Sequence, residues 1–329
     1  MGVLVTGGSG FLGGEIIRQL LSRGEYVKSF SRSRPRHLPH HHKLEICLGS
    51  ITNCHDLKEA LKGCNAVIHT AAKAGVWGPH SDYFTTNVTG TQNLLTICAE
   101  QHIPHFVYTS SPSVVYEDKS IHGKDESLPY ARFYLAHYPH SKKEAELLVL
   151  RHHNQHKIQS VALRPHLIWG PGDPHFLPRL IHRYKRKRLF QVGDGTNLVD
   201  TIHVFNAAQA HLQVLDKMRA HKDWGGKSYF IGQHKPVLLW DFLRQLLERS
   251  GQRNVNFRSV PYTLARVAGA TYESMYQALG FDHREPPMTR FLASQLYHSH
   301  YFSHQSATKD FGYFPSISTQ QGLEELHMR

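Results

Sequence analysis

A tyrosine and a lysine four residues apart form the pattern with the most chemical content. Tyr138 and Lys142 stand in the stretch YPHSK at the start of an expected helix, so both side chains lie on one face. An ammonium group beside a phenol favours the phenolate and lowers the tyrosine pKa. The tyrosine can then give or take a proton while a hydride moves at a neighbouring carbon. The pair alone is common in proteins, so its surroundings decide its meaning.

A run of hydroxyl residues precedes this pair. The segment TSSPS, residues 109–113, follows an apolar run that we expect to be a strand. A serine at the carboxyl end of such a strand can hydrogen-bond a substrate oxygen and orient it toward the tyrosine. Its position favours Ser111, and Ser110 and Ser113 are the alternatives. Each of them could instead be a turn residue that caps the strand end.

A glycine-rich turn stands almost at the start of the chain, in LVTGGSGFLGGEIIRQLL, residues 4–21. An apolar run predicts a buried strand before the turn, and apolar residues recur with helical spacing after it. Gly7, Gly10 and Gly13 let the backbone approach a pyrophosphate, and the helix N-terminus supplies unpaired N–H groups. The sequence therefore predicts a dinucleotide site here, rather than a glycine turn without a ligand.

The end of the second expected strand indicates which dinucleotide binds. An acid at this point would hold the free ribose hydroxyl of NAD, but the chain reads FSRSR at residues 30–34. Ser31 and Arg32, with Arg34 nearby, suit a 2′-phosphate instead, so NADP(H) is favoured over NAD(H). The alternative is that these arginines only face solvent.

The elements that must position these residues alternate along the first half of the chain. Strands separated by helices predict an α/β fold with a doubly wound, Rossmann-like parallel sheet. We expect a nucleotide-binding domain at residues 1–165 with a returning segment at about 200–235. A smaller, mainly helical substrate lobe would comprise residues 166–199 and 236–329. The expected strands lie at 3–5, 26–30, 45–48, 66–69, 106–108, 160–163 and 228–231, and the expected helices at 56–61, 81–101, 138–156, 175–188 and 203–218.

Composition narrows the function further. The net charge of +12 and the basic run at 183–188 come without a nucleic-acid-binding motif, so a basic rim near an anionic ligand or a solvated surface is favoured. The 27 histidines and four cysteines lack metal-ligand spacing, so we expect no metal. No apolar run approaches the length of a membrane span, and we expect a cytoplasmic enzyme.

The chain resembles the extended short-chain dehydrogenase/reductase superfamily over nearly its whole length. The resemblance rests on TGGSGFLG, NVTGT at 87–91, TSS, YxxxK, and LRP followed by IWGPG at 163–172. It implies that Ser111, Tyr138 and Lys142 are catalytic, and that Asn87 has a structural or proton-relay role. It also implies that Pro165 and His166 lie beside the nicotinamide. The cofactor contacts so implied are Gly7, Gly10, Phe11, Leu12, Gly13, Ser31, Arg32, Ser50, Ile51, Ala71, Ala72, Tyr138, Lys142, Pro165 and Ile168.

The segment GDGTNLVD at 193–200 is similar to the corresponding segment in the 3β-hydroxysteroid dehydrogenase/isomerase branch. Val199 replaces the arginine that sugar-nucleotide enzymes place on a diphosphate, so that substrate class is disfavoured. Residues 71–78 and 167–180 resemble enzymes that reduce 2-alkyl-3-oxoalkanoates to 3-hydroxy acids, which implies an apolar β-keto acid with two alkyl tails. Lys73 beside Trp77 could then face the carboxylate and one tail, or be a surface lysine and a packing tryptophan. We expect His166 and Ser111 to be further substrate contacts.

Two other functions stay open at this point. One is a 3β-hydroxysteroid or sterol dehydrogenase, because steroids also need a large apolar pocket. The other is a regulator that binds NADP without turnover, which the retained Tyr138 and Lys142 disfavour. Residues 261–281 have roughly helical apolar spacing that suits a core or pocket lid better than a membrane anchor, and peripheral membrane association stays possible. The resemblance implies a homodimer.

Overall fold

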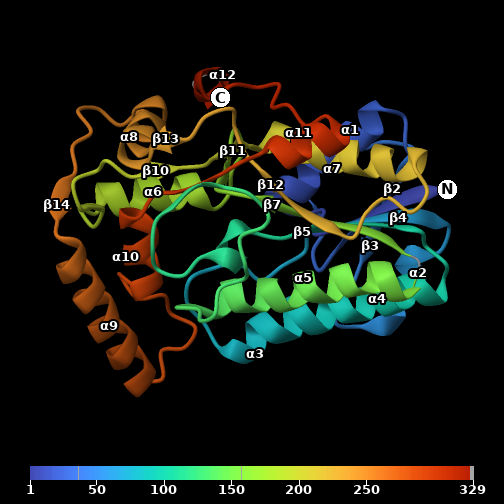
Figure 1. Ribbon diagram of the computed structural model, residues 1–329, viewed down its shortest axis with the longest axis horizontal. Helices are drawn as coiled ribbons and strands as arrows, with labels where there is room; N and C mark the ends of the chain where they lie inside the picture. The colour runs from blue at the N-terminus through green and yellow to red at the C-terminus, as the bar shows by residue number, and fades with distance from the viewer. Residues whose placement is uncertain (36, 157, 327–329) are drawn as a thin grey trace.

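A sheet of seven parallel strands forms the centre of the molecule (Figure 1), in the order β12-β7-β5-β4-β1-β2-β3. The computed structural model describes residues 1–35, 37–156 and 158–326. The order reverses between β1 and β4, so the doubly wound sheet predicted from the sequence is confirmed. Its strands are β1 (Gly2–Thr6), β2 (Val27–Ser31), β3 (Leu44–Leu48), β4 (Cys64–His69), β5 (His105–Thr109), β7 (Gln159–Pro165) and β12 (Lys227–Ile231).

Helices cover both faces of this sheet. Figure 1 shows α1 (Phe11–Ser22) and α7 (Val204–Ala220) on one face, and α4 (Gly90–Glu100) and α5 (His137–His156) on the other, with α2 (Cys54–Leu61) beside α4. Strand β1 shows how the sequence produces two cores, because its fully buried side chains alternate between the faces. Val3 and Val5 belong to the core under α1 and α7, whereas Leu4 belongs to the core under α4 and α5.

The helix expected at 81–101 has a break in its hydrogen-bonding pattern. It consists of α3 (His80–Tyr83), a π-helical segment η1 (Phe84–Thr89) and α4. Apolar spacing cannot reveal such a segment, because one wide turn shifts the apolar face of the following helix by only part of a turn. Single π turns often accompany functional sites, and this one carries the buried Asn87.

A second group of elements lies beside the carboxyl ends of the strands, on the left of Figure 1. Its helices α6 (Phe176–Lys185), α8 (Leu239–Arg249), α9 (Tyr262–Ala278) and α10 (Arg290–Tyr297) surround a separate apolar core. A small sheet, ordered β13 (Val237–Leu238), β10 (Leu198–Val199), β15 (His300–Phe302) and β6 (Ile121–Lys124), adjoins them. The sequence analysis missed these strands because two to four residues show no period. The other short elements are η2 (Pro112–Val115), β8 (Ile168–Trp169), β9 (Phe190–Val192), β11 (Ile202–His203), β14 (Arg258–Val260), α11 (Gln305–Phe311) and α12 (Thr319–Glu325).

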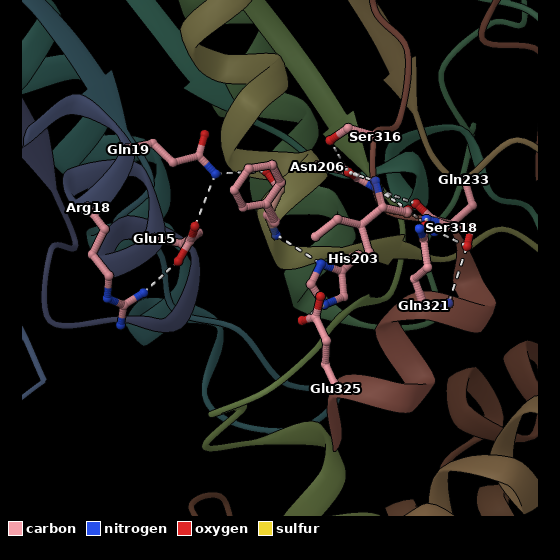
Figure 2. A network of polar contacts seen from close by, with 12 residues as sticks. Glu15, Arg18, Gln19, His203, Asn206, Gln233, Ser316, Ser318, Gln321 and Glu325 are labelled. Carbon is pink, nitrogen blue, oxygen red and sulfur yellow. Dashed lines mark hydrogen bonds and ion pairs between the residues drawn. The ribbon is translucent and has the colours of Figure 1, made fainter. Parts of the chain in front are cut away.

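The C-terminal segment is fixed to the start of α7 by the network in Figure 2. The buried Asn206 side chain accepts a hydrogen bond from Ile317 N at 3.0 Å and donates to Ile317 O at 2.7 Å. It also donates to Gln233 at the end of β12, so one amide joins three segments. No helix in the described part of the chain is long and apolar enough to span a membrane.

Replacing Asn206 tests this anchor. Asn206→Ala leaves the partly buried amide of Ile317 without its partner and removes one donor to its carbonyl, which keeps the hydrogen bond from Gln233. We therefore expect the free energy of unfolding to fall by about 1 to 3 kcal/mol. Gln209→Ala is the matched control, because Gln209 bonds the same segment through Ser316 at the surface, and should change stability by less than about 0.5 kcal/mol. Urea unfolding measures both, and equal losses would contradict the assignment.

Candidate active site

The glycine turn brings backbone closer than a side chain would permit. Gly7 has a φ of +71°, and a Cβ on Gly13 would lie 2.3 Å from the carbonyl oxygen of Gly7. Helix α1 begins directly afterwards at Phe11, with Gly10 at its N-cap position and no acidic residue in its first turn. The N–H groups of Phe11 and Leu12 therefore meet no side-chain acceptor from the cap residue, which suits a phosphate.

The ends of β2 and β3 present a hydroxyl and cations. Ser31 is buried, and its hydroxyl donates to Ser33 O at 2.8 Å. Arg32 and Arg34 are exposed and form no ion pair with any residue in the described ranges.

After β3, Ser50 N donates to the Asp56 carboxylate at 3.0 Å. The sequence analysis did not anticipate Asp56, which comes from α2. The neighbouring Ile51 is buried and Ala72, after β4, is exposed, whereas Ala71 N donates to Thr6 Oγ1.

Asn87 connects the loop after β4 to the start of α5. Its side-chain oxygen accepts from Lys73 N at 2.7 Å, and its nitrogen donates to Lys73 O at 3.0 Å and to Ser141 Oγ at 2.9 Å. Ser141 in turn donates to the carbonyl of Tyr138. The π-helical segment thus fixes the turn of α5 that carries Tyr138. Ser141 was missed because its role depends on this contact across 54 residues.

The expected serine and tyrosine lie together at the carboxyl end of β5. Burial raises the pKa of the Tyr138 phenol, and the adjacent Ser111 hydroxyl lowers it. The lowering by Lys142 that the sequence suggested is not the dominant effect. Ser111 also caps η2 and shares a hydrogen bond of 2.9 Å with Ser113 Oγ. Ser110 is buried, and its hydroxyl contacts no hydrogen-bonding partner among the described residues.

Lys142 is buried one helical turn beyond Tyr138. Its ammonium donates to Thr109 O and lies 4.2 Å from the centre of the Tyr108 ring. Burial lowers the pKa of Lys142 to about 7, and the negative charge of Glu146 opposes that shift. Glu146 lies a further turn along α5, so Tyr138, Lys142 and Glu146 share one face of the helix.

A buried ion pair continues this face into the sheet. Arg164 on β7 donates three hydrogen bonds to Glu146, with the closest contact at 2.5 Å, and Tyr130 donates to the same carboxylate at 2.7 Å. Both charged side chains are almost fully buried. Arg164 belongs to the LRP motif, but only the folded chain shows that Glu146 is its partner.

A second buried contact lies past the end of β7, where Pro165 is buried and Ile168 is partly buried. His166 Nε2 is 2.6 Å from Nδ1 of His300 on β15, and His300 Nε2 is 3.0 Å from Gln295 O. Burial lowers the pKa of both histidines, so they are neutral near pH 7. His300 was missed because it lies 134 residues away.

The loop after β4 borders two cavities. Lys73 forms an ion pair of 3.0 Å with Asp82, and Trp77 Nε1 donates to Phe281 O at 3.2 Å. Val76 borders a cavity of about 360 Å³ with mainly apolar walls and a more polar one of about 490 Å³. The apolar cavity is also lined by His166, His300 and Val199. No group of three or more potential metal ligands occurs within the described residues.

Comparisons with known proteins show the family and the fold of this chain. The family described as 3-beta hydroxysteroid dehydrogenase/isomerase family matches residues 4–262. A 2-alkyl-3-oxoalkanoate reductase of Shewanella oneidensis is 41% identical, covering 98% of this chain and 84% of the relative. A 3 beta-hydroxysteroid dehydrogenase/Delta 5-->4-isomerase of Mycobacterium tuberculosis is 34% identical over 98% and 88% of the two chains. The structure of a UDP-glucuronic acid 4-epimerase from Bacillus cereus in complex with NAD, 22% identical, superposes with a TM-score of 0.74, covering 100% and 99% of the chains, which shows the shared fold.

The buried Lys142 makes stability depend on pH. Between pH 7 and about 10 the unfolded chain holds a proton on this amine that the folded protein has released, so the free energy of unfolding rises with pH by up to about 1.4 kcal/mol per unit. Lys142→Met removes that contribution. We therefore expect the stability of the variant relative to the wild type to be greatest near pH 7 and to decline by pH 9.

Urea unfolding at several pH values measures this difference. Lys143→Met is the matched control, because Lys143 is only half-buried and pairs with Glu144, and its stability difference should not vary over the same range. Parallel curves for Lys142→Met and the wild type would show that the amine keeps an ordinary pKa.

Proposed function

The chain belongs to the 3-beta hydroxysteroid dehydrogenase/isomerase family, and from this premise we propose that it is an NADP-dependent reductase of 2-alkyl-3-oxoalkanoates. Its family and relatives make it an oxidoreductase that interconverts a ketone and a secondary alcohol. The observation that carries the proposal is the meeting of Ser111, Tyr138 and Lys142 at the carboxyl end of β5. This strand lies between β4 and β7, and the segments after those two strands line the apolar cavity through Val76 and His166.

In this mechanism the side chains bind the ketone and move one proton. The nicotinamide, when bound, supplies the hydride. Ser111 donates a hydrogen bond to the ketone oxygen, and Tyr138 gives its phenolic proton to the oxygen as negative charge develops there. Lys142 is buried, and in its protonated form, which pH values below about 7 favour, its positive charge stabilises the phenolate that remains. Asn87 acts through the backbone of α5 and positions Tyr138.

The glycine turn fits a dinucleotide because it is tighter than side chains would allow: a Cβ at Gly7 would lie 2.8 Å from Ala71 N, and one at Gly13 would collide with the carbonyl oxygen of Gly7. The tight turn leaves the N-terminus of α1 open to a pyrophosphate. Gly10, Phe11 and Leu12 would hold the pyrophosphate through their backbone. Ser31 and the unpaired Arg32 would hold a 2′-phosphate, which supports NADP over NAD. The remaining proposed cofactor contacts at the sheet edge are Ser50, Ile51, Ala71, Ala72, Pro165 and Ile168.

The substrate proposal rests on the cavity and the relatives. A 2-alkyl-3-oxoalkanoate reductase is among the most similar proteins at 41% identity, and the apolar cavity suits an alkyl chain. The proposed substrate contacts are Ser111, His166, Trp77 and Lys73. A 3β-hydroxysteroid dehydrogenase is the second candidate, favoured by the relative in Mycobacterium tuberculosis.

Other features of the chain stay predictions. These are the homodimer, the cytoplasmic location, a possible peripheral association with membranes, and the division of the chain into a nucleotide-binding domain and a substrate lobe. A regulator without turnover is disfavoured because Tyr138 and Lys142 are present together at the sheet edge.

Oxidation of a 2-alkyl-3-hydroxyalkanoic acid by NADP⁺ tests the proposed reaction. We expect NADPH formation by the purified protein, no reaction with a 3β-hydroxysteroid, and a loss of kcat of about 100-fold or more in Tyr138→Phe, since the proton donor is removed. Tyr301→Phe is the control, because the Tyr301 hydroxyl has no hydrogen bond to the described residues. If the protein oxidised only the steroid, the proposed reaction would be wrong and the second candidate function would replace it.

Replacing Arg32 tests the cofactor preference. Arg32→Ala removes a charge-assisted contact to the 2′-phosphate, so we expect the NADP⁺ dissociation constant to rise about tenfold while that for NAD⁺ changes little. Arg253→Ala is the control, because Arg253 is equally exposed but belongs to the turn before β14. Fluorescence titration of both dinucleotides measures the ratio, and an unchanged ratio would reject Arg32 as the selecting residue.

A further inference from the structure

The apolar cavity in the C-terminal lobe carries an unbalanced positive charge. Its walls come from α6, α8, α10 and β10, and include Leu180, Val199, Leu243 and Phe291. Arg179 and Arg183 line the same cavity from α6, one helical turn apart. Guanidinium groups are rarely placed against apolar walls without a negative partner.

One carboxylate serves both of these arginines. Arg179 Nη2 lies 2.5 and 2.6 Å from the two oxygens of Glu285, and Arg183 Nη2 lies 3.0 Å from one of them. No other acidic side chain of the described residues forms an ion pair with either arginine. Arg183 is about three-quarters buried, so solvent compensates its charge only in part. The group therefore has a net charge of +1 at the edge of an apolar space, where Arg183 is mostly buried and the Arg179 side chain is 53% exposed.

The other cations around the two cavities are already neutralised. Lys73 pairs with Asp82 at 3.0 Å, and Arg290 pairs with the buried Glu273 at 2.6 Å. Each of these pairs has one positive and one negative charge. An incoming anion would therefore gain more from the two arginines of α6 than from Arg290 or from Lys73, which the sequence had suggested.

The cavity that the arginines line reaches the carboxyl edge of the sheet. Val76, in the loop after β4, and His166, just past β7, line it together with Arg179 and Arg183. Strand β5 lies between β4 and β7 in the sheet, and the catalytic residues gather at its carboxyl end. In a 3-oxoalkanoate only one carbon separates the carboxyl carbon from the ketone carbon, so a carboxylate site must be near the proton donor.

We propose that Arg179 and Arg183 bind the carboxylate of the substrate, and that Glu285 keeps the two guanidinium groups in position for it. The inference rests on the proposed function and names the substrate class more narrowly: an apolar acid is selected over a neutral sterol. A carboxylate placed against the pair balances its charge and can accept bidentate hydrogen bonds from a guanidinium group. The alkyl chains then occupy the apolar walls.

Two unreactive ligands with the same tails test this site. The acid 2-hexyldecanoate and the alcohol 2-hexyl-1-decanol differ only in the carboxylate, and their binding can be followed by tryptophan fluorescence below the micelle concentration. We expect the wild type to bind the acid about tenfold or more tightly than the alcohol. Arg179→Met/Arg183→Met should remove this preference, because methionine keeps apolar length without charge.

Two further variants separate charge from packing. Glu285→Gln removes the competing negative charge, so affinity for the acid should rise while affinity for the alcohol stays the same. Arg186→Met is the matched control, because Arg186 is exposed just beyond α6 and does not line the cavity, and it should keep the wild-type preference. Unchanged binding of the alcohol to the double variant shows that the cavity is still folded.

The outcomes distinguish this site from the proposed reaction, because binding requires no hydride transfer. Equal binding of acid and alcohol to the wild type, or a preference that survives the double variant, would overturn the carboxylate site. A preference that depends on the arginines supports the site even if the 3-hydroxy acid is not oxidised, and that combination would reject only the proposed function.

Discussion

The buried ion pair between α5 and β7 is the constraint on which the arrangement of the site depends. Glu146 and Arg164 are both removed from solvent, and a buried charge without a partner costs several kcal/mol. Helix α5 can therefore lie on the sheet only with Glu146 opposite Arg164. Since Lys142 and Tyr138 precede Glu146 by one and two turns on the same face, the pair also sets where the phenol and the ammonium stand relative to the end of β5.

A second set of contacts fixes the same helix from the other direction. Asn87 holds both backbone groups of Lys73 and reaches Ser141 on α5. The first turn of α5 is thus joined to the loop after β4, while its middle is joined to β7. A phenol held at two points along its helix needs little reorganisation when it transfers a proton, and preorganised polar groups of this kind account for much of enzymatic rate enhancement.

The sequence allowed the sheet and the nucleotide turn to be predicted because their signals are local. Buried parallel strands are apolar throughout, glycine spacing is set by the turn itself, and Tyr138 and Lys142 are close in the chain. The contacts that sequence reasoning missed join distant segments: Arg164 with Glu146 across 18 residues, and His166 with His300 across 134. Glu146 and His300 belong to no sequence motif, so only the folded chain identifies them as the partners of Arg164 and His166.

Lys73 shows that predictions made from charge have the same limit, because they too depend on contacts between distant segments. Its place after β4 suggested a cation for the substrate, but a lysine's availability depends on the acids that fold around it, and Asp82 lies three ångström away. The basic run at 183–188 suggested only a rim or a solvated surface. Its first residue, Arg183, turns inward and shares Glu285 with the exposed Arg179, whereas Lys185 to Arg188 are exposed. The net charge could be calculated from the composition. What an apolar cavity can bind depends instead on where a charge lacks a partner. That position is known only from the folded chain, in which α6 packs against the loop that carries Glu285.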